Sequence, residues 1–213
     1  MGKIRYMQDV RDFFKRNIVV DINSLKKFIQ QKKGNEKYIH LLITNLIKKG
    51  EIKRITRGYY SIYDDPILSV FCFKPSYLGL QSALSVHDLW EQETIPMVIT
   101  TRKVRQGIRD VNGSNIMIRR ISKKYFFGIG YEKEGNFYVP VSSIEKTFID
   151  MVYFKQKIGK EVLNDFKKKI DRKKLNDLIK RYPNNLRKRI FGLLPERKQK
   201  RSIFIRKPPK KKT

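Results

Sequence analysis

Hydrophobic residues recur at helical spacing in three short stretches of the first fifty residues. Residues 6–16 form the first stretch, residues 21–34 the second and residues 36–49 the third. Apolar residues three and four positions apart lie on one side of a helix, so each stretch predicts a short helix with one buried side. In the third helix, the residues predicted to be buried are Ile39, Leu42, Ile43, Leu46 and Ile47.

The residues that flank these stretches are typical of helix ends. Asp21, Asn23 and Ser24 are candidates to cap the second helix by accepting hydrogen bonds from its first backbone N–H groups, and Asn35 can cap the third helix in the same way. Gly34 interrupts the second stretch, and Gly50 can adopt the positive φ that commonly ends a helix. The sequence therefore predicts three separate helices.

Residues 51–62 predict a β-hairpin with basic side chains. Thr56-Arg57-Gly58 supplies its turn, because glycine adopts positive φ without steric cost. Three short helices followed by a basic hairpin are typical of a winged helix-turn-helix, which we place at residues 1–63. The acidic segment Asp64-Asp65-Pro66 marks the predicted end of this domain.

Residues 64–195 predict an α+β domain with a small sheet and a helical C-terminal part. Residues 67–73 are apolar and fit either a helix or a strand. Helices are predicted at 80–89 and from Ser142 to about 154, strands at 97–101, 115–121 and 137–141, and hairpin turns at Asn112-Gly113 and at 132–136. Ser142-Ser-Ile-Glu145 has the pattern of a capping box. Further apolar stripes between residues 158 and 194 predict the C-terminal helices.

Charge narrows the classes of partner. The chain of 213 residues has 49 Lys and Arg against 20 Asp and Glu, a net charge of +29. The excess is +10 in residues 1–63, +1 in residues 64–154 and +18 in residues 155–213. Two basic ends around a nearly neutral middle are the electrostatic footprint of a nucleic-acid-binding protein. Residues 196–213 predict a flexible basic tail.

Other partners and sites fit the sequence less well. No stretch approaches the roughly 18 apolar residues of a membrane-spanning helix, so we expect no membrane partner. The lone Cys72 excludes an internal disulfide and a cysteine-based zinc site, and a reducing cytoplasm is the expected location. The two histidines, His40 and His87, form no metal signature with it. We expect His87 and Cys72 to be structural, and we expect no cofactor.

Three segments resemble the AbiEi-type antitoxin family, over roughly residues 5–195. Residues 50–62 resemble the wing of that family, residues 75–89 resemble its helix with the Ser-Ala-Leu and His motif, and residues 142–150 resemble its Glu-Lys-Thr-x-x-Asp helix. The resemblance implies a DNA-binding repressor of its own operon. It also implies an antitoxin to a nucleotidyltransferase-like toxin, usually without direct contact between the two proteins. The basic tail departs from the family pattern and keeps RNA or the ribosome open as a target.

The predicted third helix supplies the candidate recognition face. In a helix-turn-helix, the second helix of the pair enters the major groove and presents its N-terminal residues to base edges. Opposite the predicted buried side lie Lys37, His40, Leu41, Thr44, Asn45 and Lys48. Among them, Lys37, His40, Thr44 and Lys48 are the candidate contacts. Tyr38, at the edge of this face, either touches a phosphate or packs.

Two further groups of basic residues are candidate phosphate contacts. The hairpin contributes Lys53, Arg54 and Arg57. The tail contributes Lys198, Lys200, Arg201, Arg206 and Lys207. Of the two tyrosines in the hairpin, Tyr59 and Tyr60, one is expected in the core and the other on the nucleic-acid backbone.

A nuclease is the alternative that would make the protein an enzyme, and it would need clustered carboxylates for a divalent ion. Glu132 and Glu134 flank a predicted turn, and Glu145 and Asp150 lie about 140° apart around a helix. Because neither pair forms a metal site, we expect no catalytic residues and no enzyme activity. The leading prediction is a sequence-specific DNA-binding repressor whose first target is duplex DNA. The alternative is an RNA- or ribosome-binding protein that reuses the same fold.

Overall fold

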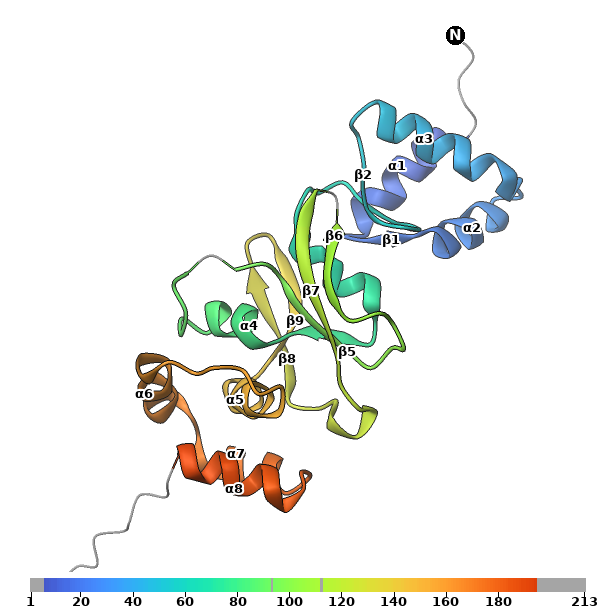
Figure 1. Cartoon of the computed structure of the whole chain (residues 1–213). Helices are drawn as coiled ribbons and strands as arrows, with labels where there is room; N and C mark the ends of the chain where they lie inside the picture. The colour runs from blue at the N-terminus through green and yellow to red at the C-terminus, as the bar shows by residue number, and fades with distance from the viewer. Residues whose placement is uncertain (1–5, 93, 112, 195–213) are drawn as a thin grey trace, which may run out of the picture.

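The protein has an α+β fold arranged as three parts along one long axis (Figure 1). A computed structural model describes residues 6–92, 94–111 and 113–194. A small helical lobe lies at the N-terminal end, a mixed sheet lies in the centre, and short helices form the C-terminal end. The predicted fold class is confirmed, with a small antiparallel sheet, a larger mixed sheet and C-terminal helices.

The N-terminal lobe has the element order and the sheet order of a winged helix. Its elements are α1 (Met7–Arg16), β1 (Val20–Asp21), α2 (Ile22–Gln31), the 3₁₀ turn η1 (Glu36–Tyr38), α3 (Ile39–Lys48), β2 (Lys53–Thr56) and β3 (Tyr59–Ser61). The strands pair in the order β1-β3-β2, all antiparallel. The α2–α3 pair is the helix-turn-helix that the sequence predicts.

The helix ends of this lobe follow from the residues there. The Asp21 carboxylate accepts hydrogen bonds of 3.0 Å from the backbone N–H groups of Asn23 and Ser24, which caps α2. After α3, Gly50 takes a φ of +70° and donates its N–H to the Ile47 carbonyl. Gly34 allows the turn between α2 and α3, because a Cβ there would lie 2.6 Å from a side-chain carbon of Ile29.

Two details of the predicted third helix are wrong. Residues 36–38 form a 3₁₀ turn, and the regular helix begins at Ile39. Ile47, predicted to be buried, has 40% of its surface exposed. The remaining apolar residues predicted for this side are buried, namely Ile39, Leu42, Ile43 and Leu46. The packed side of α3 is therefore narrower than the apolar stripe in the sequence.

The central part is built on a six-stranded sheet with the strand order β6-β7-β5-β4-β9-β8. Its elements are η2 (Pro66–Phe73), β4 (Ser76–Leu78), α4 (Leu80–Val86), β5 (Met97–Thr100), β6 (Gly107–Val111), β7 (Ser114–Arg120), η3 (Lys123–Tyr125), β8 (Ile129–Glu134), β9 (Phe137–Ser142) and α5 (Ile144–Tyr153). The parallel β4–β9 and β5–β7 pairs join three antiparallel pairs. The apolar segment left open by the sequence is the 3₁₀ helix η2.

Two local predictions in this part need correction. Strand β8 continues to Glu134, so the turn of its hairpin is Gly135 and Asn136 and does not begin at residue 132. The cap of α5 is Ser143, whose hydroxyl accepts a hydrogen bond from the Lys146 N–H, and not Ser142. At the predicted hairpin turn, Val111 of β6 pairs with Ser114 of β7 and Gly113 has a φ of +77°, while Asn112 lies outside the described residues.

The two faces of the central sheet are covered by different elements. One face packs against η2, with Leu68, Val70 and Cys72 among its buried side chains. The other face packs against α4, α5 and the C-terminal helices α6 (Lys160–Lys169), α7 (Arg172–Ile179) and α8 (Asn184–Leu193). Because Phe166 of α6 and Ile190 of α8 share this second core, the C-terminal helices are part of the central domain.

The N-terminal lobe also packs against the central part. Ile55 of β2 is 4% exposed and belongs to the core that contains Leu68 of η2 and Val111 of β6. After β3, the ring of Tyr63 packs edge-on against Phe137 of β9, with 4.8 Å between the ring centroids. Residues 64–66 therefore connect two parts of the protein whose apolar side chains pack against each other.

Candidate nucleic-acid interface

The outward face of α3 carries polar and basic side chains and one exposed leucine. His40, Thr44 and Lys48 are exposed, and Leu41 has 46% of its surface exposed. Lys37 is exposed on the 3₁₀ turn that leads into the helix. All four predicted contacts are therefore exposed, three of them on α3 and Lys37 on the turn before it.

The electrostatics of this face are one-sided. Helix α3 contains no Asp or Glu. Elsewhere in the lobe, Asp9 pairs with Lys32, and the Glu51 carboxylate accepts hydrogen bonds of 2.6 and 2.7 Å from Arg11. Those bonds from Arg11 hold the pKa of Glu51 below its ordinary value. Asp9 and Glu51 are therefore engaged by basic residues outside α3.

Four of the basic candidates on the turn, the helix and the wing have no such partners. Within residues 6–92, 94–111 and 113–194, none of the side chains of Lys37, Lys48, Arg54 and Arg57 forms an ion pair. Their positive charges therefore remain available to a polyanion.

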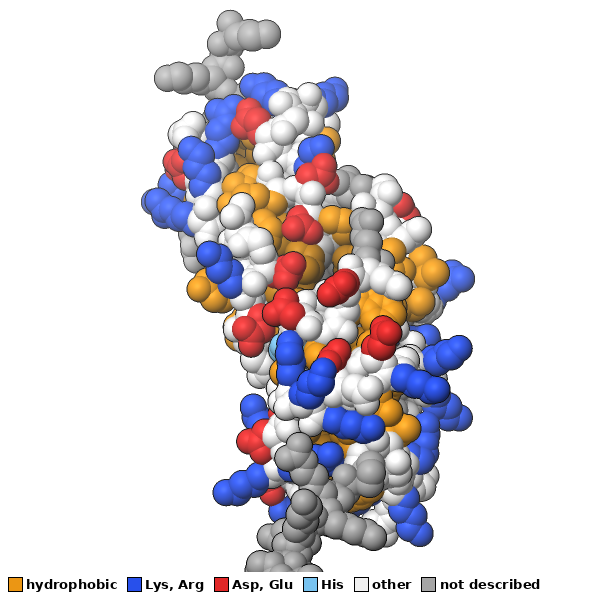
Figure 2. All heavy atoms as spheres, turned by 90° about the vertical axis from the view of Figure 1, so that its left-hand side faces the viewer, with side chains coloured by type: hydrophobic (Ala, Val, Ile, Leu, Met, Phe, Trp, Pro, Cys, Tyr) orange, Lys and Arg blue, Asp and Glu red, His pale blue; other side chains and the backbone are white. Residues whose placement is uncertain are grey.

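Charge is distributed over the whole molecule as the sequence indicates. Figure 2 shows Lys and Arg side chains gathered over the N-terminal lobe and over the C-terminal helices, with Asp and Glu side chains across the middle. The described C-terminal segment, residues 155–194, has 14 Lys and Arg against 4 Asp and Glu. The two basic regions of the sequence lie at opposite ends of the molecule.

Tyr38 lines a shallow groove beside the recognition face. The groove is lined by Tyr6, Lys33, Gly34, Asn35, Lys37, Tyr38 and Leu41. Tyr38 is half-buried and packs against the core of the N-terminal lobe. Of the two alternatives for Tyr38, its position is that of a packing residue.

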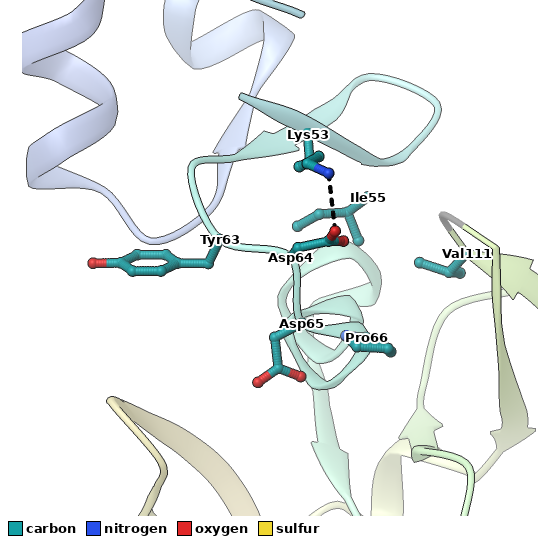
Figure 3. A pocket seen from close by; sticks show the side chains of 7 residues that line it. All are labelled: Lys53, Ile55, Tyr63, Asp64, Asp65, Pro66 and Val111. Atoms are coloured by element: carbon teal, nitrogen blue, oxygen red, sulfur yellow. Dashed lines mark hydrogen bonds and ion pairs between the residues drawn. The ribbon is translucent and has the colours of Figure 1, made fainter. Parts of the chain in front are cut away.

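The wing is short, and the side chains of its strand β2 alternate between the central domain and solvent. Arg54 and Arg57 are exposed, whereas Lys53 forms an ion pair of 3.0 Å with Asp64 (Figure 3). Successive side chains of a strand point to opposite faces. Lys53 and Ile55 line the small crevice against the central domain, and Arg54 lies between them on the other face of β2.

The two tyrosines of the wing both pack against protein. Tyr60 belongs to the core of the N-terminal lobe, and Tyr59 packs against the central core. Tyr59 is therefore not positioned as the backbone contact that the sequence allowed for. The tail candidates Lys198, Lys200, Arg201, Arg206 and Lys207 lie outside the described residues.

The sequence interpretation missed a buried polar cluster in the central domain. The Lys146 ammonium group pairs with Asp150 one helical turn later and donates hydrogen bonds of 3.2 Å to the hydroxyls of Tyr77 and Tyr182. Tyr77 in turn donates a hydrogen bond of 2.7 Å to the other oxygen of Asp150. The side chains of Lys146 and Asp150 are 0% exposed.

Burial dominates the electrostatics of this cluster. It lowers the pKa of Lys146 and raises the pKa of Asp150, while their mutual attraction opposes both changes. Burial also raises the pKa of Tyr77 and of Tyr182. The cluster is buried and links Tyr77 of β4 to α5 and to Tyr182, so its role is structural. The Lys-x-x-x-Asp spacing was its only sequence signal.

The remaining candidate residues have structural positions. His87 Nε2 lies 2.7 Å from the Ser142 carbonyl, and Cys72 is buried, which raises the pKa of its thiol to about 12. Both agree with the structural roles predicted. The Glu145 carboxylate accepts a hydrogen bond of 3.1 Å from the backbone N–H of Asp171. Over the described part of the chain, no three His, Cys, Asp or Glu residues are grouped as ligands for a metal ion.

No described helix is both long enough and apolar enough to cross a membrane.

Comparisons with known proteins support the fold alone. No protein family matches the sequence, and no curated protein matches it. A solved structure of RV2827C protein from Mycobacterium tuberculosis is similar, with a TM-score of 0.58 and 13% sequence identity. The similarity covers 89% of this chain and 75% of that one. A similar overall fold therefore occurs in another protein.

Proposed function

We propose that the protein is a sequence-specific DNA-binding transcriptional repressor that acts in the cytoplasm. In this proposal, α3 enters the major groove of duplex DNA, and the wing contacts the phosphate backbone. The observation that carries the proposal is the outward face of α3, which has no acidic residue and exposes His40, Thr44 and Lys48. Lys37 is exposed on the turn that precedes this helix. An acid-free, basic face on the second helix of a helix-turn-helix fits DNA better than it fits a protein partner.

The residues have separate roles in this proposal. Lys37 and His40 can donate hydrogen bonds to guanine, and the Thr44 hydroxyl can contact either base pair. Arg54 and Arg57 neutralise phosphates and set the orientation of the protein on the duplex. Lys53 is engaged by Asp64, so we leave it out of the proposed interface.

The biological role is proposed from the family resemblance. AbiEi-type antitoxins repress their own operon and counteract a nucleotidyltransferase-like toxin, and we propose the same pair of roles here. A neighbouring gene for a nucleotidyltransferase, whose toxicity is relieved when this protein is co-expressed, is the expected result. A repressor that binds upstream DNA but relieves no toxicity would remove the antitoxin role and leave the DNA-binding role standing.

A competition titration tests DNA binding. The probes are the duplex immediately upstream of the gene, a random duplex of equal length and ribosomal RNA. Wild type should prefer the upstream duplex, and Lys37→Ala/His40→Ala/Thr44→Ala should lose that preference, since each good bidentate contact is worth roughly 1–3 kcal/mol. The matched control is Lys188→Ala/Arg189→Ala on α8, where both side chains are exposed. This control should bind all three probes more weakly by a similar factor and keep the preference.

The second candidate function is RNA or ribosome binding. The observation that favours it is the excess of positive charge in residues 155–194, which have 14 Lys and Arg and only 4 Asp and Glu. This segment lies at the end of the molecule opposite to α3. A-form RNA has a major groove too deep and narrow for a helix, so α3 would not read its sequence. In that case wild type would prefer ribosomal RNA to every duplex. The α3 triple variant would keep that preference, and the α8 variant would lose affinity.

A further inference from the structure

An aliphatic side chain lies near the centre of the proposed recognition face. At about 100° per residue, Leu41 and Thr44 are about 60° apart around α3, and Leu41 and Lys48 are about 20° apart. All three are exposed, and Leu41 has 46% of its surface open to solvent. Leu41 is therefore one helical turn from Lys37 on one side and two turns from Lys48 on the other, within a basic stripe.

A second exposed aliphatic residue on the same helix provides a comparison. Ile47 is 40% exposed, but it lies about 40° from the buried Ile43 and about 100° from Lys48. Ile47 therefore borders the core of the lobe, where an incompletely covered apolar residue is ordinary. Leu41 differs because it lies about 100° from the nearest buried residue, Leu42, and lines the open groove with Tyr38 and Lys37.

Leu41 restricts what the face can recognise. Its side chain neither donates nor accepts hydrogen bonds, so it gains binding free energy only by covering apolar surface. In the major groove of DNA, the apolar group on the base edges is the C5 methyl of thymine. The cations before and after Leu41 favour phosphates on both sides of the groove, which would hold the leucine over the base edges between them.

We infer that Leu41 is a specificity-determining residue that contacts thymine methyl groups, so that the recognised DNA site contains thymine opposite the middle of α3. This inference rests on the proposed DNA-binding function and names the base that the function selects. It also separates DNA from RNA, because uracil lacks the methyl group. An RNA target would leave Leu41 without an apolar partner on the base edges.

The experiment uses the whole protein and two pools of random duplex DNA, one made with thymine and one with deoxyuridine. Selection from the thymine pool should enrich one motif with thymine at defined positions. The enriched duplex is then resynthesised with deoxyuridine at those positions one at a time. Loss of a contacted methyl should weaken wild-type binding roughly fourfold, the ratio that corresponds to burial of one methyl-sized group.

Two variants assign the effect to a residue. Leu41→Ala should bind the thymine and deoxyuridine duplexes with equal affinity, whereas Ile47→Ala should keep the wild-type difference. Both changes are at exposed helical positions, so equal melting temperatures for the three proteins should confirm that the fold is intact. A thymine effect that survives in Leu41→Ala would overturn the assignment to this residue.

The failures of the two proposals are distinguishable. An enriched motif that wild type binds equally well with thymine and with deoxyuridine would overturn the methyl contact and leave sequence-specific DNA binding in place. Failure of the thymine pool to enrich any motif would overturn both.

Discussion

The hydroxyl of Tyr77 donates a 2.7 Å hydrogen bond to Asp150, which lies 73 residues further along the chain. Tyr77 belongs to the first and Asp150 to the second of the two central segments on which the family resemblance rests. The Lys146 ammonium group contacts both residues and also the hydroxyl of Tyr182, at the end of α7. One buried polar cluster therefore joins β4, α5 and the C-terminal segment.

Breaking the buried ion pair of this cluster should destabilise the protein much more than breaking an exposed ion pair. Asp150→Ala leaves the Lys146 charge buried and unpaired, so the free energy of unfolding should fall by about 3–5 kcal/mol. The matched change Asp165→Ala removes the partner of Lys168 in an exposed pair of 2.9 Å on α6. It should cost at most about 1 kcal/mol. Urea unfolding of both variants measures the difference.

A double variant tests the reason for that loss. Lys146→Met/Asp150→Leu removes both charges and should recover much of the lost stability, because a buried ion pair can often be replaced by apolar residues of similar volume. If the double variant is as unstable as Asp150→Ala, the polar contacts to Tyr77 and Tyr182 would be the main stabilising feature instead of the charge pair.

The ion pair between Arg11 and Glu51 predicts an acid-dependent change in stability. The folded-state pKa of Glu51 is lowered by its hydrogen bonds from Arg11, so the pair stabilises the fold above the ordinary glutamate pKa of about 4.3. That contribution should disappear as the pH falls below this value. Glu51→Gln should therefore be less stable than wild type at pH 7, with the gap narrowing as the pH falls below the ordinary glutamate pKa. Thermal melts across this range are the measurement, and a gap independent of pH would contradict the assignment.

The elements of the N-terminal lobe could be predicted because their signals are local. Asp21 and Gly50 end helices through contacts with residues only a few positions away, and the pattern of α3 repeats within ten residues. Sheet order in the central domain had no such signal, because the neighbours β4 and β9 are some sixty residues apart and joined in parallel.

The buried cluster shows why part of the site could not be predicted. Lys146 and Asp150 are four residues apart on a helix, a spacing that usually indicates an exposed pair. What buries them is α7, together with Tyr77 on β4, and no pattern within α5 indicates that cover. The ion pair of Lys53 was not predicted for a similar reason, since its partner Asp64 lies beyond the wing. The exposure of Ile47 could not be predicted either, because it depends on how far the core of the N-terminal lobe extends along α3.

Two neighbours on the wing strand predict opposite phenotypes. Ile55 is buried against the central domain, so Ile55→Ala should lower the free energy of unfolding by about 2–5 kcal/mol. Arg54 is exposed beside it, so Arg54→Ala should change stability by no more than about 0.5 kcal/mol. Its effect should be on DNA binding, where the loss of one phosphate contact should reduce the salt slope by about 1. If Arg54→Ala left both the affinity and the salt slope unchanged, the wing would not be part of the interface.

The basic tail should contribute to the salt dependence of DNA affinity, whereas the winged helix should determine which duplex is preferred. Each phosphate that a lysine or arginine neutralises releases counterions, so affinity should fall by at least about 10³ between 50 and 200 mM salt if six or more phosphates are contacted. Deleting residues 197–213 removes nine Lys and Arg and no acid. The truncated protein should bind every duplex more weakly at 50 mM salt, with a shallower salt slope, and should keep its cooperative melt and its preference among duplexes. That preference should remain because the base contacts come from α3. Filter-binding titrations at four salt concentrations measure both slopes. A truncated protein with an unchanged slope would show that the tail contacts no phosphate, and one with an altered site preference would show that the tail reads sequence.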